Sequence, residues 1–251
     1  MPRMFNRNMS ITSALILSNI VVFVLGTILP PVPAIFGIPY DSSPYTESLL
    51  LVRGAYSWYT CFMEGEIWRL ITYQFLHGGT MHLVFNMWML YFFGHMVENA
   101  MGQRRFLAFY LACGVAGALC SSLLASLGLF NNMEHFPAAL QMQLAHYTGQ
   151  PGLQFWQLVP MVGASAAIYG ILIAVAFMYP HMPIRLVFPP VTLTLRTFAL
   201  LVLVVAVVTV MMNGNNAGGE AGHLGGIILA TIIMSIWRWR FLRKRRDEGL
   251  F

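Results

Sequence analysis

Six apolar runs, each long enough to cross a bilayer, constrain this chain more than any other feature of its sequence. Only 9% of its 251 residues are charged, whereas a soluble domain carries about 25%. A membrane-spanning helix needs about 17 to 25 mostly apolar residues, and such runs lie at 11–29, 81–97, 106–130, 163–179, 193–212 and 221–237. The sequence therefore predicts an all-α membrane protein, a bundle of six transmembrane helices that forms a single domain over 1–251.

The basic residues predict how these runs are oriented. Twelve of the 14 Lys and Arg lie at the chain ends, between the second and third runs, or between the fourth and fifth: Arg3, Arg7, Arg104, Arg105, Arg185, Arg196, Arg238, Arg240, Arg243, Lys244, Arg245 and Arg246. All these segments share one side of a six-span topology, and the positive-inside rule makes that side cytoplasmic. We expect both termini to be cytoplasmic. The net charge of +5 then indicates topology and attraction to membrane lipid, and we expect no nucleic-acid partner.

The first run could be mistaken for the apolar part of a signal peptide. No convincing cleavage site follows "LGTILPPVP" at 25–33 and five more runs come after it, so we expect it to be retained. Short tails without a transit-like extension favour a bacterial plasma (inner) membrane. The three cysteines have neither metal nor disulfide spacing, and we expect them to be packing residues: Cys61, Cys113 and Cys120.

Polar residues occur where the second, fourth and sixth runs begin. The second run opens with His82 and Asn86 of "MHLVFN", the fourth with Ser165 of "VGASAAIYG", and the sixth with His223 of "AGHLGG". All three runs are predicted to cross from the external to the cytoplasmic side, so these residues share one depth. His82 and Asn86, four residues apart, lie on one helical face. Polar residues inside membrane spans are costly and usually face a cavity or a functional site.

This set of residues predicts nucleophilic catalysis. A serine beside a histidine in a pocket shielded from lipid forms a nucleophile and its general base, which here are Ser165 and His223. His82, Asn86 and the backbone N–H of Ser165 are candidate donors to an oxyanion. The aspartates lie outside the runs, at Asp41 and Asp247. With no carboxylate expected to orient His223, the prediction is a dyad that needs no metal or organic cofactor.

The motifs resemble those of rhomboid intramembrane serine proteases, in the order in which that family has them. "EIWRL" at 66–70 resembles the Trp-Arg pair of the first loop, and "MHLVFN" at 81–86 the His-x-x-x-Asn of the second helix. "GASAAIYG" at 163–170 resembles the nucleophile motif, and "GHLGG" at 222–226 the motif that carries the base. The resemblance implies supporting roles for Trp68, Arg69, Gly163 and Tyr169, with Tyr169 packing on the catalytic histidine.

The resemblance further implies a serine endopeptidase that cleaves the transmembrane segments of single-span membrane proteins, which enter laterally past the fifth helix. One residue departs from the family pattern: Ala166 stands where glycine typically follows the serine. We expect its added methyl group to crowd the fourth helix against the sixth, where Gly222, Gly225 and Gly226 allow close approach.

Other functions fit the sequence less well. A zinc protease needs an H-E-x-x-H run, and an aspartyl intramembrane protease needs two aspartates within its spans; the sequence has neither. A transporter would show repeated halves or charged residues along a path, and neither is visible. The alternative to a protease is a catalytically silent rhomboid-like binder of membrane proteins. Such relatives typically lose the serine or the histidine, whereas this chain has both.

Overall fold

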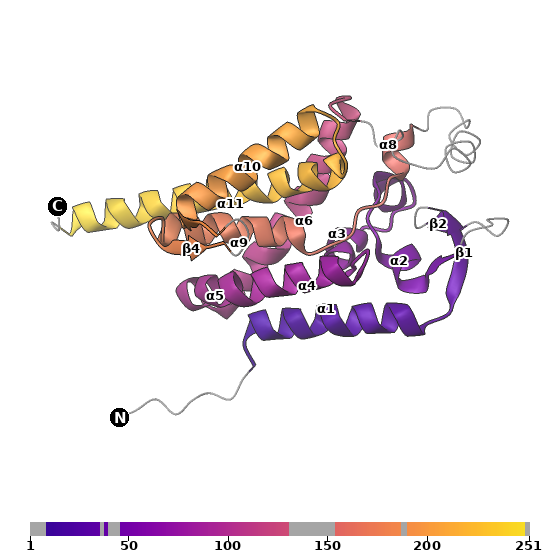
Figure 1. Cartoon of the computed structure of the whole chain (residues 1–251), viewed down its shortest axis with the longest axis horizontal. Helices are drawn as coiled ribbons and strands as arrows, with labels where there is room; N and C mark the ends of the chain where they lie inside the picture. The colour runs from indigo at the N-terminus through magenta and orange to yellow at the C-terminus, as the bar shows by residue number, and fades with distance from the viewer. Residues whose placement is uncertain (1–8, 36–37, 40–45, 131–153, 187–189, 249–251) are drawn as a thin grey trace.

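The protein is a bundle of helices, seen in a computed structural model that describes residues 9–35, 38–39, 46–130, 154–186 and 190–248 (Figure 1). Each predicted apolar run is helical over most of its length. The helices are α1 (Ile11–Ile28), a continuous segment made of α4 (Thr80–Met89), the π-helical η3 (Leu90–Gly94) and α5 (His95–Met101), then α6 (Gln103–Ser126), α9 (Ser165–Met178), α10 (Leu195–Met211) and α11 (Ala217–Asp247). By length and composition, α1, α6 and α11 are candidate membrane spans.

Helices α6, α9 and α11 pack closely because glycines line their contacts. A methyl group at Gly170 of α9 would lie 2.6 Å from Sγ of Cys113 on α6, and one at Gly226 of α11 would overlap the backbone carbonyl of Ala166 on α9. Small residues of this kind let helix backbones approach one another. As a result α9 is buried along most of its length, and Ala166, its second residue, lies against Gly117 of α6 and Gly226 of α11.

The first helix is anchored to the second helical segment through its N-terminus. The carboxylate of Glu98 on α5 accepts hydrogen bonds from the backbone N–H groups of Ile11 and Thr12, at 2.8 and 2.9 Å, and from the Thr12 hydroxyl at 2.6 Å. The first N–H groups of a helix lack partners within it and carry partial positive charge, so a carboxylate there is stabilising. Ser10 completes the cap by accepting from the N–H of Ser13.

One end of the bundle carries short elements that the all-α prediction does not include. Strands β1 (Pro31–Ile35), β2 (Ile38–Pro39) and β3 (Thr46–Ser48) form an antiparallel sheet in the order β2-β1-β3, with Val32 opposite Glu47. Beside it lie α2 (Leu49–Gly54), the π-helical η1 (Tyr59–Met63), α3 (Arg69–Thr72), the 3-10 turn η2 (Tyr73–Phe75) and α8 (Phe155–Leu158). We call this end of the bundle the cap end.

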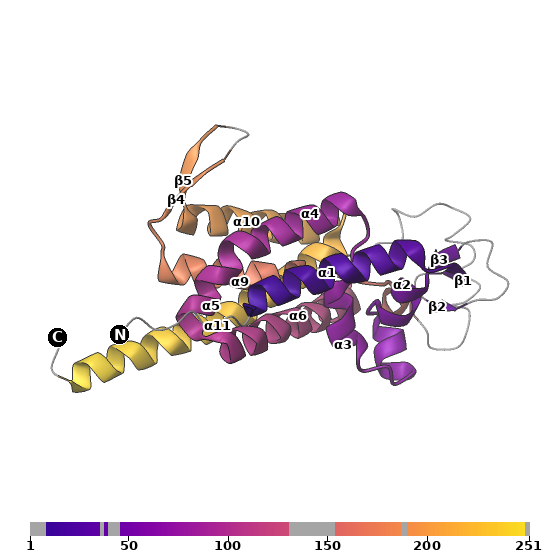
Figure 2. The same ribbon diagram turned by 90° about the horizontal axis from the view of Figure 1, so that it is seen from below.

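The opposite end of the bundle is marked by the first and the last helix. Helix α1 begins there and α11 extends well beyond its neighbours (Figure 1). The antiparallel hairpin of β4 (Pro183–Arg185) and β5 (Thr192–Thr194) projects from the same end, beside α10 (Figure 2). This end also holds most of the basic residues that the orientation depends on, and we call it the basic end. Arg3 and Arg7 lie outside the described residues.

Apolar side chains fill the interior and also cover the outside of the bundle. The interior cluster includes Leu90, Phe106, Tyr110, Ile171 and Leu195, all fully buried. On the outside, large apolar residues of α1, α4, η3 and α10 are exposed, among them Val24, Leu25, Trp88, Phe92, Leu201 and Val205. A soluble monomer rarely exposes so much contiguous apolar surface, so the outer surface of these helices suits contact with lipid. Of the three cysteines, Cys61 and Cys113 are buried and Cys120 is half-buried.

Candidate active site

Ser165 is the first residue of α9, and a glycine just before it makes that start possible. Gly163 has a φ of +123°, which residues other than glycine rarely adopt. Its N–H donates to the carbonyl of Tyr73 at 2.9 Å, so the incoming strand-like segment is fixed before the helix begins. Because Ser165 occupies the first turn, its own N–H has no partner within the helix and lies at the positive end of the helix dipole.

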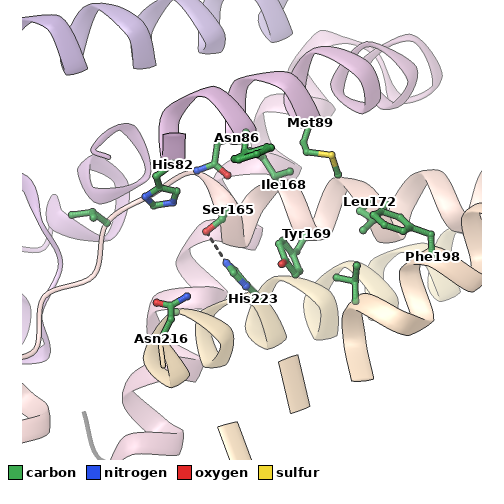
Figure 3. Close-up of a pocket in the computed structure, with 14 residues that line it drawn as sticks. His82, Asn86, Met89, Ser165, Ile168, Tyr169, Leu172, Phe198, Asn216 and His223 are labelled. Atoms are coloured by element: carbon green, nitrogen blue, oxygen red, sulfur yellow. Dashed lines mark hydrogen bonds between the residues drawn. The ribbon is translucent and has the colours of Figure 1, made fainter. Parts of the chain in front are cut away.

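His223 reaches Ser165 from the second turn of α11. Its Nε2 lies 2.8 Å from Oγ of Ser165, across the contact between α9 and α11 (Figure 3). The ring of Tyr169 stacks on the His223 ring, with centroids 3.8 Å apart and planes inclined by 16°. Tyr169 follows Ser165 by four residues and so shares its helical face. Helix α9 thus provides both the hydroxyl that contacts the imidazole and the surface that holds the ring in place.

The second ring nitrogen of His223 also has a partner. Nδ1 lies 2.9 Å from Oε2 of Glu220, three residues earlier on α11, and both side chains are largely buried, at 10% and 16% exposed. The prediction that no carboxylate is placed beside His223 is therefore wrong. Glu220 stands one residue before the sixth apolar run and so outside the predicted span. Its i, i+3 spacing to His223 is the sequence signal that identifies it.

His82 and Asn86 form the opposite wall of the site, on α4 (Figure 3). A methyl group at Gly163 would lie 2.8 Å from Cε1 of His82, so the glycine also makes room for this ring. Asn86 is buried, and its side-chain nitrogen has no hydrogen-bond partner in the part of the chain that the structure describes. A buried donor without a partner costs about 1–3 kcal/mol. The Asn86 amide is therefore available to a group that enters the cavity.

Four polar residues line one cavity of about 310 Å³ between α4, α9, α10 and α11: His82, Asn86, Ser165 and His223. Apolar side chains make up much of the remaining wall, namely Phe85, Met89, Ile168, Leu172, Phe198 and Val202. An apolar cavity with a few convergent polar groups is the usual form of an active or ligand-binding site. Within the described residues, no three His, Cys, Asp or Glu side chains come together as a metal site.

Trp68 and Arg69 do not line this cavity. Arg69 is buried, and its guanidinium donates to the backbone carbonyls of Val52 and Ala55 at 2.8 and 2.6 Å while pairing with Glu66. It therefore ties the end of α2 to α3 at the cap end. Trp68 is 54% exposed. Both positions suit the supporting roles that the sequence suggested, at a distance from the reacting groups.

The methyl group of Ala166 is accommodated by a glycine on α6. A methyl group at Gly117 would lie 2.5 Å from Cβ of Ala166, so the missing side chain of Gly117 leaves room for it. On the other side, Gly226 of α11 lies against the backbone of Ala166. The methyl group of Ala166 therefore lies against α6 and not against α11, where the sequence analysis expected crowding, and Ala166 is buried with 1% of its surface exposed.

His77 is a further residue near the site, to which the sequence gave no role. Its ring is buried and packs edge-on against His82, with centroids 5.0 Å apart. Burial, with a smaller contribution from His82, lowers the pKa of His77 to about 4. The ring is therefore neutral at physiological pH and forms part of the support behind His82.

Fold and site together define a helical membrane protein in which a serine and a histidine meet at the edge of an apolar cavity. Residues 64–240 match the family model of the Rhomboid domain, and the chain belongs to the rhomboid family. The match includes all four residues of the site, together with Glu220, Trp68 and Arg69.

Curated relatives include proteases and a protein named as inactive. Rhomboid protease AarA of Providencia stuartii is 27% identical over 225 residues, covering 89% of this chain and 71% of that protein. Rhomboid protease GluP of Bacillus subtilis (strain 168) is 29% identical over 175 residues, which are 68% of this chain and 27% of GluP. Inactive RHOMBOID-like protein 8 of Arabidopsis thaliana is 36% identical over 78 residues, which are 31% of this chain and 22% of that protein.

Proposed function

We propose that the protein is an intramembrane serine endopeptidase that cleaves transmembrane segments of single-span membrane proteins. The contact of 2.8 Å between Ser165 Oγ and His223 Nε2, at the edge of a cavity between four helices, carries this proposal. The protease names of the relatives AarA and GluP support it. Membership of the rhomboid family and the apolar helices support a substrate that itself lies in the membrane.

The first half of the reaction is acylation. Oγ of Ser165 attacks the scissile carbonyl carbon while Nε2 of His223 takes the hydroxyl proton. The carbonyl oxygen becomes an oxyanion, which accepts hydrogen bonds from the Asn86 amide, from His82 and from the N–H of Ser165. Donors of this kind contribute about 3 to 4 kcal/mol each in soluble proteases. The tetrahedral intermediate then breaks its C–N bond, and His223 returns the proton to the leaving amine.

The second half of the reaction is hydrolysis of the acyl-enzyme. A water molecule attacks the ester carbonyl while His223 takes its proton. The second intermediate then breaks its C–Oγ bond and releases a carboxylic acid, while His223 returns the proton to Oγ of Ser165. Water must therefore reach the site. Helix α9 has 14 residues, or about 21 Å at 1.5 Å per residue, which is shorter than the roughly 30 Å hydrocarbon layer. Ser165, at its start, is thus recessed in the membrane within a cavity that includes polar groups.

The apolar walls of the cavity suggest the path of the substrate. Phe85 and Met89 come from α4, and Phe198 and Val202 from α10. A transmembrane segment that moves in from the lipid between α4 and α10 would meet these apolar side chains first and the polar residues behind them. This path agrees with the lateral access past the fifth helix that the family resemblance implies.

The orientation of the helices across the membrane is also part of what we propose. All six helical segments cross the membrane as one domain, with the cap end outside and the basic end, including both termini, in the cytoplasm of a bacterial cell. The positive-inside rule supports this orientation, because Arg104, Arg105 and the six basic residues near the end of α11 lie toward the basic end.

The alternative function is that of a catalytically silent binder of membrane proteins. Its support is the inactive plant relative and the alanine after the serine. Against it stand the contact between Ser165 and His223 and the room that Gly117 leaves for Ala166. A silent binder has no need for a hydroxyl and an imidazole held at hydrogen-bond distance.

Cleavage in lipid vesicles tests the proposal. The full chain is reconstituted with a model single-span substrate that carries tags at both ends, and products are followed on gels. We expect two fragments from the wild type and none from Ser165→Ala or His223→Ala, with the cut inside or beside the substrate's transmembrane segment. Intact substrate with folded wild-type protein, across several substrates, would favour the silent binder.

A further inference from the structure

We infer that Glu220 is a positioning residue, which holds His223 in the orientation and tautomer that a general base requires. This inference rests on the proposed function, because it assigns Glu220 a role in the same reaction. It replaces the predicted dyad with a linear Ser165–His223–Glu220 arrangement, in which a single helix, α11, supplies both the base and the group that orients it.

The hydrogen bonds determine which nitrogen of His223 carries the proton. An ionised carboxylate only accepts hydrogen bonds, so at 2.9 Å from Glu220 the Nδ1 atom is the donor. A neutral imidazole has one protonated nitrogen, which leaves Nε2 with a free lone pair directed at the Ser165 hydroxyl, 2.8 Å away. Without the carboxylate, the neutral ring could equally protonate Nε2, and that tautomer cannot take the serine proton.

In the part of the chain that the structure describes, His223 is the side chain that pairs with Glu220. The other titratable side chains that face His223 are His82 on α4 and Tyr169 on α9, and none of the residues that line the cavity is Lys or Arg. On α6, Cys120 packs against Gly225 of α11, two residues after His223. Glu220 also lies in the first turn of α11, where the helix dipole favours a carboxylate.

The same geometry stabilises the charged state that the reaction creates. When Nε2 takes the proton from Ser165, His223 becomes an imidazolium ion at the edge of an apolar cavity. A carboxylate 2.9 Å from Nδ1 offsets that charge at the moment it forms, as the aspartate does in a soluble Ser-His-Asp protease. In those enzymes replacing the aspartate by asparagine lowers kcat about 10⁴-fold. The Glu220 side chain keeps 16% of its surface exposed, whereas that aspartate is buried, so we expect a smaller effect, a loss of about 10- to 100-fold in kcat.

The first test reads the tautomer of His223 without any activity. ¹⁵N-histidine-labelled protein in detergent is examined by NMR at neutral pH, and the His223 signals are assigned as those missing from His223→Ala. We expect the wild type to show a protonated Nδ1 and an unprotonated Nε2, and Glu220→Ala to lose this preference. A wild-type His223 that is protonated at Nε2, or a spectrum that Glu220→Ala leaves unchanged, would overturn the inference even if no substrate is ever cleaved.

The second test is kinetic and compares two substitutions of Glu220. Glu220→Gln keeps the size but offers an amide that can donate to Nδ1, whereas Glu220→Ala removes the group. A residue that only stabilises α11 would tolerate Gln better than Ala. We expect both variants to lose kcat for the tagged substrate by about 10- to 100-fold, with KM within about two-fold of the wild type.

Two controls separate this result from loss of fold or of function. Glu64→Gln removes an exposed carboxylate near the cap end, outside the cavity, and we expect wild-type kcat. Thermal unfolding in detergent shows whether the Glu220 variants fold. Wild-type kcat in folded Glu220→Gln and Glu220→Ala would overturn the positioning role while leaving the proposed protease intact. If the wild type itself cleaves nothing, the proposed function fails and the NMR result alone decides whether Glu220 sets the tautomer.

Discussion

At the scale of single residues, Asn86 is a buried polar group of the cavity wall whose side-chain nitrogen has no hydrogen-bond partner among the described residues. Its side-chain nitrogen is buried and unpartnered within the described part of the chain, whereas Ser165, His223 and Glu220 form a connected row of hydrogen bonds. An unpaired buried donor is unfavourable in the free protein. A tetrahedral intermediate supplies the missing acceptor, so the amide can stabilise the transition state more than the ground state.

We therefore predict that Asn86→Ala lowers kcat about 10²- to 10³-fold, as loss of an oxyanion donor does in soluble proteases, with little change in KM. The measurement is steady-state cleavage of a single-span substrate in vesicles. Asn19→Ala is the matched control: it removes a buried amide on α1 that bonds to the carbonyl of Leu15 and lies outside the cavity. Equal kcat values for the wild type and Asn86→Ala would remove Asn86 from the oxyanion site.

A second prediction concerns His77 and the dependence of stability on pH. Its pKa is lowered from 6.5 to about 4 by burial and by His82. Between these values the unfolded chain binds more protons at this position than the folded protein, so the free energy of unfolding decreases as the pH falls from about 6.5 to about 4. We predict a drop in the thermal unfolding midpoint over this range that is smaller in His77→Phe. His181→Gln, at an exposed histidine, should keep the wild-type drop; identical pH profiles for His77→Phe and the wild type would contradict the prediction.

At the scale of elements, the junction of α6, α9 and α11 decides whether Ser165 and His223 meet. Ala166 fits there because Gly117 has no side chain. We predict that Gly117→Ala reduces thermal stability and cleavage together, since its methyl group would lie 2.5 Å from that of Ala166 and 2.9 Å from the carbonyl of Gly222. A thermal unfolding scan with a parallel cleavage assay measures both.

Exchanging the two residues provides the internal control. In the double variant Gly117→Ala with Ala166→Gly, the closer contact disappears, whereas the contact with Gly222 remains. We expect partial recovery of both stability and cleavage, and Ala166→Gly alone should cleave within a few-fold of the wild type. A Gly117→Ala protein as stable and active as the wild type would show that the junction is looser than these contacts indicate.

A comparison of the helices with the apolar runs shows how much of the fold the sequence could predict. Apolar runs locate the helices well: the first run at 11–29 became α1 at Ile11–Ile28. They fail where a helix continues beyond its apolar part, as in α11, which runs to Asp247 through Arg and Lys residues that are good helix formers. The start of α9 at Ser165 depends on the positive φ of Gly163, and no apolar pattern carries that information.

The sequence could predict which residues form the site, because they lie near the starts of helices that run in one direction. These residues are His82, Asn86, Ser165 and His223. Glu220 was missed for a physical reason. A carboxylate just outside an apolar run is normally solvated, and only the fold shows that this one is largely buried against His223. Similarly, the short strands at the cap end depend on pairing between separate segments, which local sequence does not specify.

At the scale of the whole molecule, the cap end and the basic end should face opposite sides of the membrane. We predict that Glu64→Cys, at the cap end, reacts with a membrane-impermeant maleimide on intact bacterial cells, and that Glu248→Cys, at the end of α11, reacts only after permeabilisation. Both positions are exposed. The parent protein gives the background from its own cysteines, of which Cys61 and Cys113 are buried. Labelling of Glu248→Cys on intact cells would reverse the orientation.

The central claim is that Ser165 is a nucleophile activated by His223, and a covalent trap tests it most directly. The full chain in lipid vesicles is treated with a fluorophosphonate, which reacts with activated serines, and the modified residue is identified by mass spectrometry of its peptides. We predict an adduct on Ser165 of the wild type and a much slower reaction in His223→Ala. A folded wild-type protein without an adduct on Ser165, or one modified at the same rate in His223→Ala, would contradict the claim.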